Sequence, residues 1–303
     1  IDSINDMNNL KYAEEISATN PCAEQPLPPF GACLLGSLNL TKFCEGGEFH
    51  MDRMLNAIPY VVRATDNIID ETIYPLRAQE MEAKNKRRMG LGVTGLANVL
   101  SYIGLDYGSP EALEWTDKLM RAFTNACYLA SSQIAREKGS FPFFHSEKYS
   151  EGKFFKQLEP EVQRHIMQHG LRNSHLTSIA PTGSISLAAN NVSSGIEPVF
   201  AHSFTRTYID KVGPQTELVE DYGVAEWGIY AKQTAEVTVN EHVDMLTTVQ
   251  KWVDSSVSKT CNIGDDVTFD DFKEVYLRAY DGGAKGCTTF RAAGKRSGIL
   301  QAP

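Results

Sequence analysis

Residues 17–40 read SATNPCAEQPLPPFGACLLGSLNL, and the interpretation of the whole chain starts from this stretch. Four prolines fall within residues 21–29 of this stretch. Because proline fixes φ and carries no backbone N–H, they predict a stiff loop rather than a helix. The second half, Cys33–Leu40, is a short apolar run of the kind found in buried strands. We therefore expect a rigid loop that leads directly into a strand.

Helical and strand-like patterns alternate on the C-terminal side of this stretch. Apolar residues recur at helical spacing in Met51–Thr72, Ser109–Gly139, Pro160–Gly170, Glu241–Lys259 and Thr268–Asp281. Short strand-like runs lie at Cys33–Leu40, Leu176–Ala180, Ser184–Ala188, Glu236–Val239 and Lys285–Phe290. Helices that alternate with short buried strands predict an α/β fold, and no linker divides residues 1–303 into separate domains.

Composition limits the classes to which the protein can belong. With 303 residues, of which 42% are hydrophobic, the chain can bury a sizeable core. Its net charge of -9 argues against non-specific binding of nucleic acid, which requires a basic surface. No apolar run approaches the roughly 18 residues of a membrane span, and no charged-then-apolar leader begins the chain. We expect a soluble cytoplasmic enzyme.

Asn20, Cys22 and Glu24 are separated by single residues within the proline-rich loop. Pro21 restricts Asn20 to an extended conformation, and residues i, i+2 and i+4 of an extended chain point the same way. An amide, a thiol and a carboxylate would then be directed together from one stiff segment. From spacing alone, the alternative is a surface loop with an incidental cysteine.

The segment Asn20–Thr41 resembles the finger-loop region of ribonucleotide reductases, in particular those of the adenosylcobalamin-dependent class II. The resemblance continues in order along the chain through Arg87–Gly92, Asn173–Leu176, Ala180–Ser186, Ser193–Pro198, Ser258–Thr260 and Lys285–Arg291. It implies an α/β fold that is roughly the second half of a ten-stranded α/β barrel, with a central finger loop that carries the catalytic cysteine. Residues 1–303 would then be the C-terminal catalytic portion of the barrel domain, without its N-terminal half.

The resemblance also implies roles for individual side chains. Cys22 would carry a thiyl radical that removes the 3′ hydrogen atom of the ribose. Glu24 would accept the 3′-hydroxyl proton as general base, and Asn20 would hydrogen-bond the substrate hydroxyls. Cys33 would belong to a redox-active pair that donates two electrons and ends as a disulfide, its partner lying in the N-terminal half of the barrel. Without the resemblance, Cys33 is equally well a buried strand cysteine.

A polar turn follows the strand-like run at Leu176–Ala180. It consists of Pro181, Thr182, Gly183, Ser184 and Ile185. Glycine lets the backbone approach a ligand closely, hydroxyls can donate hydrogen bonds, and successive N–H groups in such a turn form an anion site. The sequence lacks the Gly-Lys-[Ser/Thr] of a P-loop ATPase. The alternative is an ordinary polar turn, whereas the resemblance implies that these residues bind the substrate phosphates.

Two features bear on the source of the radical. Class I reductases receive it through two adjacent tyrosines near the end of the barrel, and the matching segment Lys285–Arg291 contains no tyrosine. The Asn-Pro-Cys form of the finger loop also favours class II. Adenosylcobalamin is therefore the expected cofactor, and it would generate the radical directly at Cys22. The 7 histidines and 6 cysteines show no metal-ligand spacing, so no metal-binding residue is predicted.

Substrates and partners follow from the same resemblance. It implies ribonucleotide substrates, 2′-deoxyribonucleotide products for DNA synthesis, and a thioredoxin-like reductant. Half a barrel leaves strand edges unpaired, so we expect a complementary N-terminal half. The resemblance implies a homo-oligomer when the enzyme is complete. Because the chain begins with Ile1, it fits a trimmed fragment or a split subunit. No membrane or nucleic acid partner is expected. Diphosphate and triphosphate substrates both stay open, as do the allosteric effectors.

Two other functions fit part of the pattern. A glycyl-radical enzyme also carries a finger-loop cysteine, but it needs a glycine radical site near its C-terminus and commonly a zinc-binding C-x-x-C. Neither is evident in the sequence. A nucleotide-binding or assembly fragment would keep the phosphate loop and have no turnover without the complementary half. Replacing Cys22 by alanine separates this fragment from a reductase, because binding would survive and reduction would not.

Overall fold

The computed structural model describes residues 2–264, 267–291 and 300–301. The helices are α1 (Asp2–Met7), α2 (Met51–Glu71), α3 (Arg77–Lys86), α4 (Leu96–Tyr102), α5 (Pro110–Lys138), α6 (Ser146–Ser150), α7 (Lys153–Lys156), α8 (Pro160–His169), α9 (Gly183–Ala188), α10 (Tyr222–Trp227), α11 (Val239–Gln250) and α12 (Phe269–Asp281), with short 3-10 helices η1 (Leu40–Phe43) and η2 (Thr234–Glu236). The strands are β1 (Ala18–Thr19), β2 (Pro26–Leu27), β3 (Leu34–Asn39), β4 (Cys44–Glu45), β5 (Glu48–Phe49), β6 (Met89–Thr94), β7 (Ser203–Asp210), β8 (Gly213–Glu220), β9 (Thr260–Asn262), β10 (Thr288–Phe290) and β11 (Leu300–Gln301).

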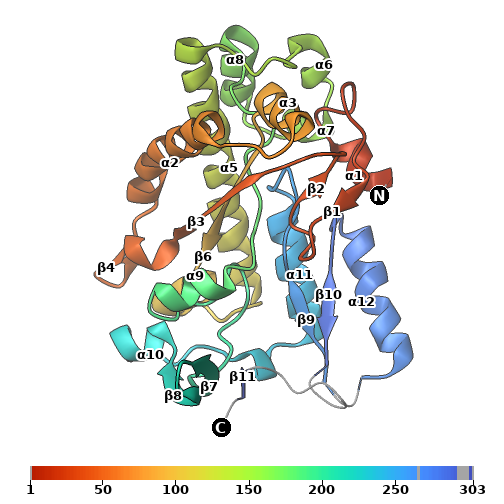
Figure 1. The fold of residues 1–303 in the computed structure, drawn as a ribbon. Coiled ribbons are helices and arrows are strands. Elements are labelled where there is room, and N and C mark those ends of the chain that lie inside the picture. The colour runs from red at the N-terminus through yellow and green to blue at the C-terminus, as the bar shows by residue number, and fades with distance from the viewer. Residues whose placement is uncertain (1, 265–266, 292–299, 302–303) are drawn as a thin grey trace.

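Parallel segments form the centre of the fold (Figure 1). β3 pairs with β6 in parallel along its whole length. β6 is bridged in parallel to the extended segment 176–180, which is bridged in turn to the segment 255–259. The latter continues into β9, and β9 pairs in parallel with β10. Neighbouring segments thus run in one direction within an α/β arrangement, as predicted, and the sheet is not closed within the described residues.

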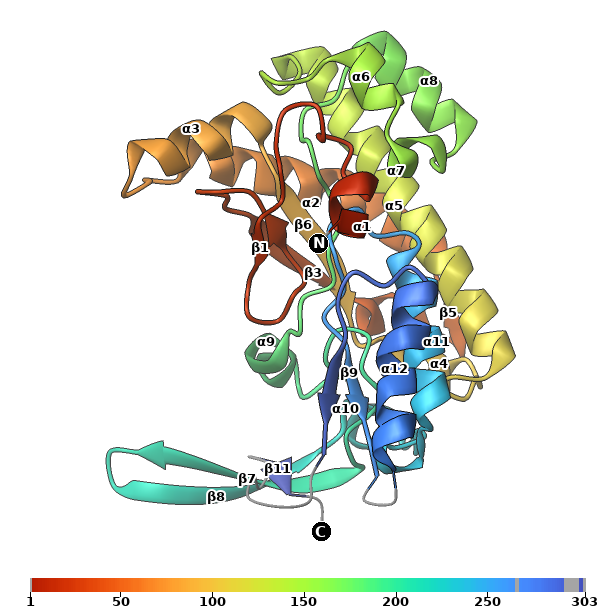
Figure 2. The same ribbon diagram turned by 90° about the vertical axis from the view of Figure 1, so that its right-hand side faces the viewer.

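The two faces of this sheet differ in chemistry. Met89, Leu91 and Val93 of β6 are buried in the hydrophobic core that also contains residues of α2 and α5. The alternate residues Gly90 and Gly92 point to the opposite face, which we call the loop face. Figure 2 shows the β1–β2 hairpin on this side of the strands and α5 and α11 on the other. The same strands therefore contribute to the core with one face and support the hairpin with the other.

Four predicted helices are confirmed to within one or two residues, as α2, α5, α8 and α12. Ser109 caps the start of α5, and its hydroxyl accepts a hydrogen bond from the Ala112 N–H at 3.1 Å. α2 continues through Pro59, although proline removes a helix hydrogen bond. Pro59 is exposed, while Ile58 and Val62 are fully buried, so the burial of the opposite side keeps the helix intact.

Two segments predicted as strands are wrong. Ser184–Ala188 lies in α9, and Glu236–Val239 spans the end of η2 and the start of α11. At this start the Thr238 hydroxyl accepts the Glu241 N–H, and the Glu241 carboxylate accepts the Thr238 N–H. This capping box starts the helix. The alternation of apolar and polar residues over only four positions could not distinguish a helix from a strand.

The helix predicted for Glu241–Lys259 is α11, but it ends at Gln250. Apolar residues keep a helical spacing beyond this point. The segment 255–259 nevertheless joins the sheet, where it exchanges backbone hydrogen bonds with the segment 176–180. Pairing with a distant strand therefore decides the conformation here, and the local pattern does not.

The sequence did not predict the β7–β8 hairpin, which projects from the body of the molecule (Figure 2). Its strands pair antiparallel from Ser203 opposite Glu220 to Asp210 opposite Gly213, and β11 pairs with β7. Its tip is exposed and does not contribute to the core.

Candidate active site

The finger-loop segment is a tight turn, so the prediction of an extended conformation is wrong. β1 and β2 pair antiparallel, and residues 20–25 connect them. The Asn20 N–H donates to the Gln25 carbonyl at 3.2 Å, and the Ala23 N–H donates to the Asn20 carbonyl at 3.0 Å. Ala23 has a φ of 62°, in the left-handed region. Asparagine followed by proline is a common start for such a turn.

The turn separates the three side chains that an extended loop would place on one face. Cys22 is exposed at the tip, whereas the Glu24 residue is only 3% exposed. Asn20 is half-buried, and its Oδ1 accepts the Gln25 N–H at 3.1 Å. Asn20 thus closes the turn that presents the thiol. The structure keeps the three residues in one short turn but does not direct them the same way.

Glycines on the loop face let the turn approach the sheet. A Cβ on Gly90 would lie 2.4 Å from Nε2 of Gln25, so a larger residue would collide with the loop. A Cβ on Gly286, next to β10, would lie 3.0 Å from the Cβ of Ala23. The turn therefore lies against both β6 and the segment that leads into β10.

Two serines fix the backbone of the turn. The carbonyl of Glu24 accepts a hydrogen bond from Ser178 Oγ at 2.9 Å and from the Ser256 N–H at 3.1 Å. These donors come from the neighbouring segments 176–180 and 255–259 of the sheet. The turn at residues 20–25 is thus held at a defined position on the sheet.

Buried polar atoms without partners gather in the same turn. Oε2 of Glu24 and both polar side-chain atoms of Gln25 are buried and have no hydrogen-bond partner among the described residues. Each unpaired buried group of this kind costs about 1–3 kcal/mol. Such groups are rare in stable cores, so their concentration beside Cys22 makes this turn the candidate site for a polar ligand.

Cys33 lies immediately before β3, and the residue as a whole is half-buried. Burial raises the pKa of the Cys33 thiol well above its ordinary value. The Arg88 guanidinium opposes this rise, and the carboxylates of Asp254 and Glu24 add to it. Cys33 therefore lies within electrostatic range of Glu24, and the structure brings these two sequence-predicted residues together.

The sequence analysis missed a buried ion pair next to Cys33. Nη2 of Arg88 donates to both carboxylate oxygens of Glu14, at 2.6 and 2.7 Å. Lys86 Nζ lies 2.8 Å from the same carboxylate. Burial alone would raise the pKa of Glu14, but Arg88 and Lys86 hold it well below its usual range. Arg88 lies in a motif that was recognised by resemblance and given no role.

A second buried group of charges, also unpredicted, surrounds Asp254. Its carboxylate accepts the Tyr128 hydroxyl at 2.7 Å and two backbone N–H groups of the segment 176–180. Lys285 Nζ donates to the carbonyls of Asp254 and Ser255, at 2.6 and 2.8 Å. Burial lowers the pKa of Lys285 to about 8. A cavity of about 10 Å³, the size of one water molecule, is lined by Ile4, Asn8, Ile16, Pro26, Arg88, His175, Asp254, Ser255 and Lys285.

The predicted phosphate loop, Pro181–Ile185, forms the start of α9. Thr182 is buried with a φ of 53°, and its hydroxyl accepts the Gly195 N–H at 2.7 Å and lies 2.9 Å from the Thr94 hydroxyl. This hydroxyl therefore stabilises the loop and is not available to a ligand. Gly183 and the two residues after it are exposed, and a Cβ on Gly183 would meet no atom within 4 Å. Their N–H groups belong to the first helical turn, which leaves them without intrahelical acceptors.

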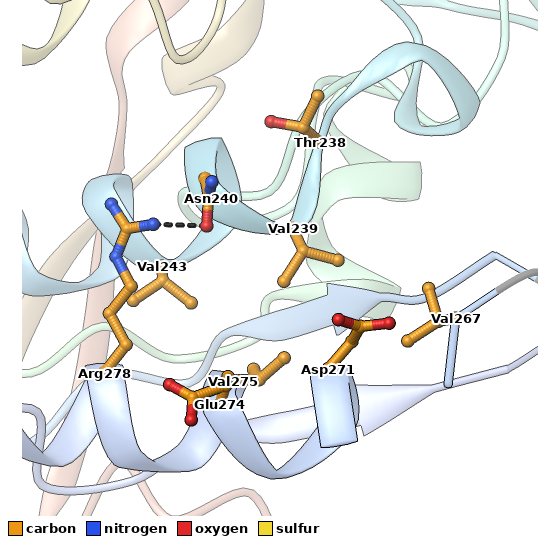
Figure 3. A pocket seen from close by; sticks show the side chains of 9 residues that line it. All are labelled: Thr238, Val239, Asn240, Val243, Val267, Asp271, Glu274, Val275 and Arg278. Carbon is orange, nitrogen blue, oxygen red and sulfur yellow. Dashed lines mark hydrogen bonds between the residues drawn. The ribbon is translucent and has the colours of Figure 1, made fainter. Parts of the chain in front are cut away.

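A separate pocket of about 330 Å³ lies between α11 and α12 (Figure 3). It is lined by Thr238, Val239, Asn240, Val243, Val267, Asp271, Glu274, Val275 and Arg278. Arg278 donates to Asn240 and to Asp244, so its charge is already paired. This pocket contains no residue of the sequence-predicted site.

Two kinds of feature are absent from the described residues. No group of three or more His, Cys, Asp or Glu side chains in them could hold a metal ion. None of their helices combines the length and the apolar character that crossing a membrane requires.

Comparisons with known proteins identify the family. The family model described as "Ribonucleotide reductase, barrel domain" matches residues 1–290. A "Vitamin B12-dependent ribonucleoside-diphosphate reductase" of Mycobacterium tuberculosis (strain CDC 1551 / Oshkosh) is 33% identical over 327 residues, which cover 99% of this chain and 45% of the relative. A protein of the same name from Thermoplasma acidophilum is 34% identical, over 100% of this chain and 41% of the relative.

A more distant relative is the "Ribonucleoside-diphosphate reductase subunit alpha" of Treponema pallidum (strain Nichols). It is 28% identical over 84% of this chain and 30% of its own length. The chain thus spans less than half the length of these relatives. Because the family model matches residues 1–290, which is nearly the whole chain, this chain belongs to the ribonucleotide reductase barrel-domain family.

Proposed function

We propose that this chain is the C-terminal catalytic portion of an adenosylcobalamin-dependent ribonucleotide reductase, which reduces ribonucleotides to 2′-deoxyribonucleotides through a thiyl radical on Cys22. One observation carries the proposal: an exposed Cys22 on a turn whose buried Glu24 has an unpaired carboxylate oxygen and lies within electrostatic range of Cys33. The names of the Mycobacterium tuberculosis and Thermoplasma acidophilum relatives support the same reaction.

Each residue of the turn has a distinct part in the proposed chemistry. The Cys22 sulfur removes the 3′ hydrogen atom of the ribose, because an S–H bond is weak enough to exchange a hydrogen atom with carbon. Glu24 accepts the 3′-hydroxyl proton through its unpaired oxygen, so that the 2′-hydroxyl can leave as water. The Oδ1 atom of Asn20 is engaged within the turn, which leaves its NH₂ group to donate to a substrate hydroxyl.

Cys33 supplies reducing equivalents in this proposal. Together with a second cysteine it gives two electrons and two protons and becomes a disulfide, which a thioredoxin-like dithiol protein reduces again. We place the second cysteine in a complementary N-terminal half. An open parallel sheet and a chain that covers 45% of a relative fit roughly the second half of a ten-stranded barrel. The complete enzyme would be a homo-oligomer.

The substrate phosphates would bind at Pro181–Ile185. The exposed first turn of α9 offers backbone N–H groups, and the open space beside Gly183 allows close approach of a phosphate. Thr182 contributes by fixing the loop through its bonds to Gly195 and Thr94. Backbone groups rather than the Thr182 hydroxyl would therefore make the phosphate contacts.

The residues present fit adenosylcobalamin as the radical source. The cofactor supplies a carbon-centred radical when its cobalt–carbon bond breaks. Its cobalt is already chelated by the corrin ring, so the protein need not provide a cluster of metal ligands. Cys22 is exposed and can be reached by a large group. Phe290, on β10, has no phenolic hydrogen that could relay a radical as a tyrosine does.

The test measures deoxyribonucleotide formation by the full chain combined with its complementary N-terminal half, in the presence of adenosylcobalamin and a dithiol. Ribonucleoside diphosphates and triphosphates are compared. Cys22→Ser should abolish turnover, whereas Cys44→Ser, a half-buried cysteine on β4, should retain it. Product formation by Cys22→Ser would refute the thiyl radical. Nucleotide binding without turnover by the combined wild-type halves would instead support a binding or assembly function.

A further inference from the structure

Arg88 and Cys33 occupy neighbouring positions at the start of two paired strands. β3 and β6 pair in parallel with Leu34 opposite Met89, so the preceding residues, Cys33 and Arg88, continue the same register. Residues in register project to the same face of a sheet. Gly90, two residues after Arg88, points to the loop face. The guanidinium and the thiol therefore lie side by side on the face that supports the finger loop.

Arg88 is 3% exposed, and its guanidinium is only partly engaged. Nη2 contacts both oxygens of Glu14, which also pairs with Lys86. Nε of Arg88 is buried and has no hydrogen-bond partner among the described residues. A buried N–H group without an acceptor is unfavourable, so its presence beside a redox cysteine requires a physical reason.

The charges that face Cys33 come from separate elements. Arg88 precedes β6, Glu24 lies in the finger loop, and Asp254 precedes the segment that continues into β9. Burial and the two carboxylates disfavour a negative charge on the sulfur, whereas Arg88 favours it. Lys285 contacts the carbonyl of Asp254 and lies farther along the same cluster. Without Arg88, a thiolate at Cys33 would be buried near two carboxylates.

We propose that Arg88 stabilises the Cys33 thiolate that forms when the site's disulfide is reduced, with the free Nε–H group donating to the sulfur. This inference rests on the redox role proposed above for Cys33. It also gives Glu14 a positioning role. The Glu14 carboxylate holds Nη2 of Arg88 and leaves the Nε–H group without an acceptor among the described residues, so that Nε–H can donate to the sulfur.

The step balances as an ordinary thiol–disulfide exchange. A thiolate of an external dithiol attacks the partner sulfur, the S–S bond breaks, and its electron pair stays on Cys33 Sγ, which then takes up a proton. The second thiolate of the dithiol breaks the mixed disulfide, so the dithiol is oxidised and both cysteines end as thiols. The rate of the first exchange depends on the stability of the leaving thiolate. Arg88 therefore accelerates re-reduction of the enzyme.

The test follows the ionisation of Cys33 in the full chain. Alkylation by iodoacetamide is measured as a function of pH, and peptide mass spectrometry reports the modification of Cys33. Arg88→Gln should slow alkylation at a fixed pH by about tenfold, which corresponds to a pKa raised by about one unit. Glu14→Gln breaks the same ion pair but removes a negative charge, so it should leave the rate unchanged or increase it.

The paired variants distinguish charge from packing. A loosened structure would speed alkylation of Cys33 in both variants, whereas the proposal requires slower alkylation in Arg88→Gln alone. A rate in Arg88→Gln equal to or above that of the wild type overturns the proposal. If that variant does not fold, Arg88→Lys decides. Lysine keeps the charge beside Glu14 but lacks the Nε–H group, so alkylation should be severalfold slower, and a wild-type rate would overturn the assignment of Nε.

Turnover of the complete enzyme tests the underlying redox role separately. Cys33→Ser should prevent repeated turnover with a dithiol reductant. If Cys33→Ser retains full turnover, Cys33 has no redox function, and Arg88 then has no part in re-reduction of the enzyme. The alkylation profile still reports independently whether Arg88 controls the ionisation of Cys33.

Discussion

Replacing Gly90 by alanine should displace the finger loop and crowd the sheet segment at Ser178. The new Cβ would lie 2.4 Å from Gln25 Nε2, and 2.8 Å from both Leu35 Cδ2 and Ser178 Cβ. Ordinary van der Waals contact begins at 3.4 Å, so the Gln25 side chain must retreat by about 1 Å. Gln25 is buried and adjoins Glu24 in the turn, so the displacement reaches both the proposed base and the proposed radical thiol of Cys22.

The expected magnitudes separate activity from stability. Overpacking of this kind costs about 1–3 kcal/mol, which is smaller than the free energy of unfolding of most proteins. A misplacement of about 1 Å in a catalytic group can reduce the rate by about 100-fold. Gly90→Ala should therefore lower turnover by about 100-fold, while the free energy of unfolding falls by no more than about 3 kcal/mol.

Gly36→Ala is the matched control for this prediction. Its Cβ would lie 3.0 Å from Leu91 Cδ2, so it crowds the same pair of strands from the core side. Deoxyribonucleotide formation and urea unfolding should be measured for both variants. Turnover by Gly90→Ala within about threefold of the wild type would refute the reasoning, because a displacement of about 1 Å in the catalytic groups should lower the rate by much more than threefold. An equal loss of turnover in Gly36→Ala would show that strand crowding alone is responsible.

Three further substitutions test other parts of the structure. Glu24→Gln should lower turnover by about 10²–10⁴-fold in the same assay, and wild-type turnover would exclude Glu24 as the base. Burial lowers the pKa of Lys285 to about 8, below its unfolded value of about 10.4. Between about pH 8 and about pH 10.4 the unfolded chain binds more protons at Lys285 than the folded chain does, so this residue should increase the free energy of unfolding as pH rises. Urea titrations of Lys285→Met at several pH values should show no such increase from this position. Asp66 is fully buried and accepts hydrogen bonds from Arg87 and Arg172. Asp66→Ala should therefore lower the free energy of unfolding by about 3–5 kcal/mol, and a loss below about 1 kcal/mol in urea unfolding would contradict the buried ion pair.

Helices with strong local signals were predictable from the sequence. Ser109 and Thr268 each accept a hydrogen bond from an N–H in the first turn of the helix that follows, and both starts were predicted correctly. The information lies within four residues of the helix end, so no distant contact is needed. The end of α11 was not predictable in this way. Residues 255–259 are extended instead of helical because a partner segment more than 70 positions earlier, 176–180, forms backbone hydrogen bonds with them.

The sequence named Asn20, Cys22 and Glu24 as candidates for the site, but it did not predict their geometry. The spacing of Asn20, Cys22 and Glu24 indicated a shared face only if the chain was extended. The same asparagine and proline also favour a turn, and the hydrogen bonds of Asn20 to Gln25 show which preference prevailed. The supports of the turn lie more than 60 positions away and belong to strands that are not neighbours in sequence, so local patterns could not connect them with Cys22.

The alternation along β6 explains how one strand serves both stability and function. Its large residues, such as Leu91, face the core, while Gly90 on the other face meets the finger loop. A Cβ on Gly92 would lie 2.2 Å from the backbone oxygen of Ser178, so glycine there permits the sheet itself, whereas glycine at Gly90 permits the approach of the loop. Small residues on the loop face therefore do not represent a weakly packed core. They create the space in which an irregular turn can be seated on a rigid sheet, with Cys22 exposed and Glu24 buried beside Cys33.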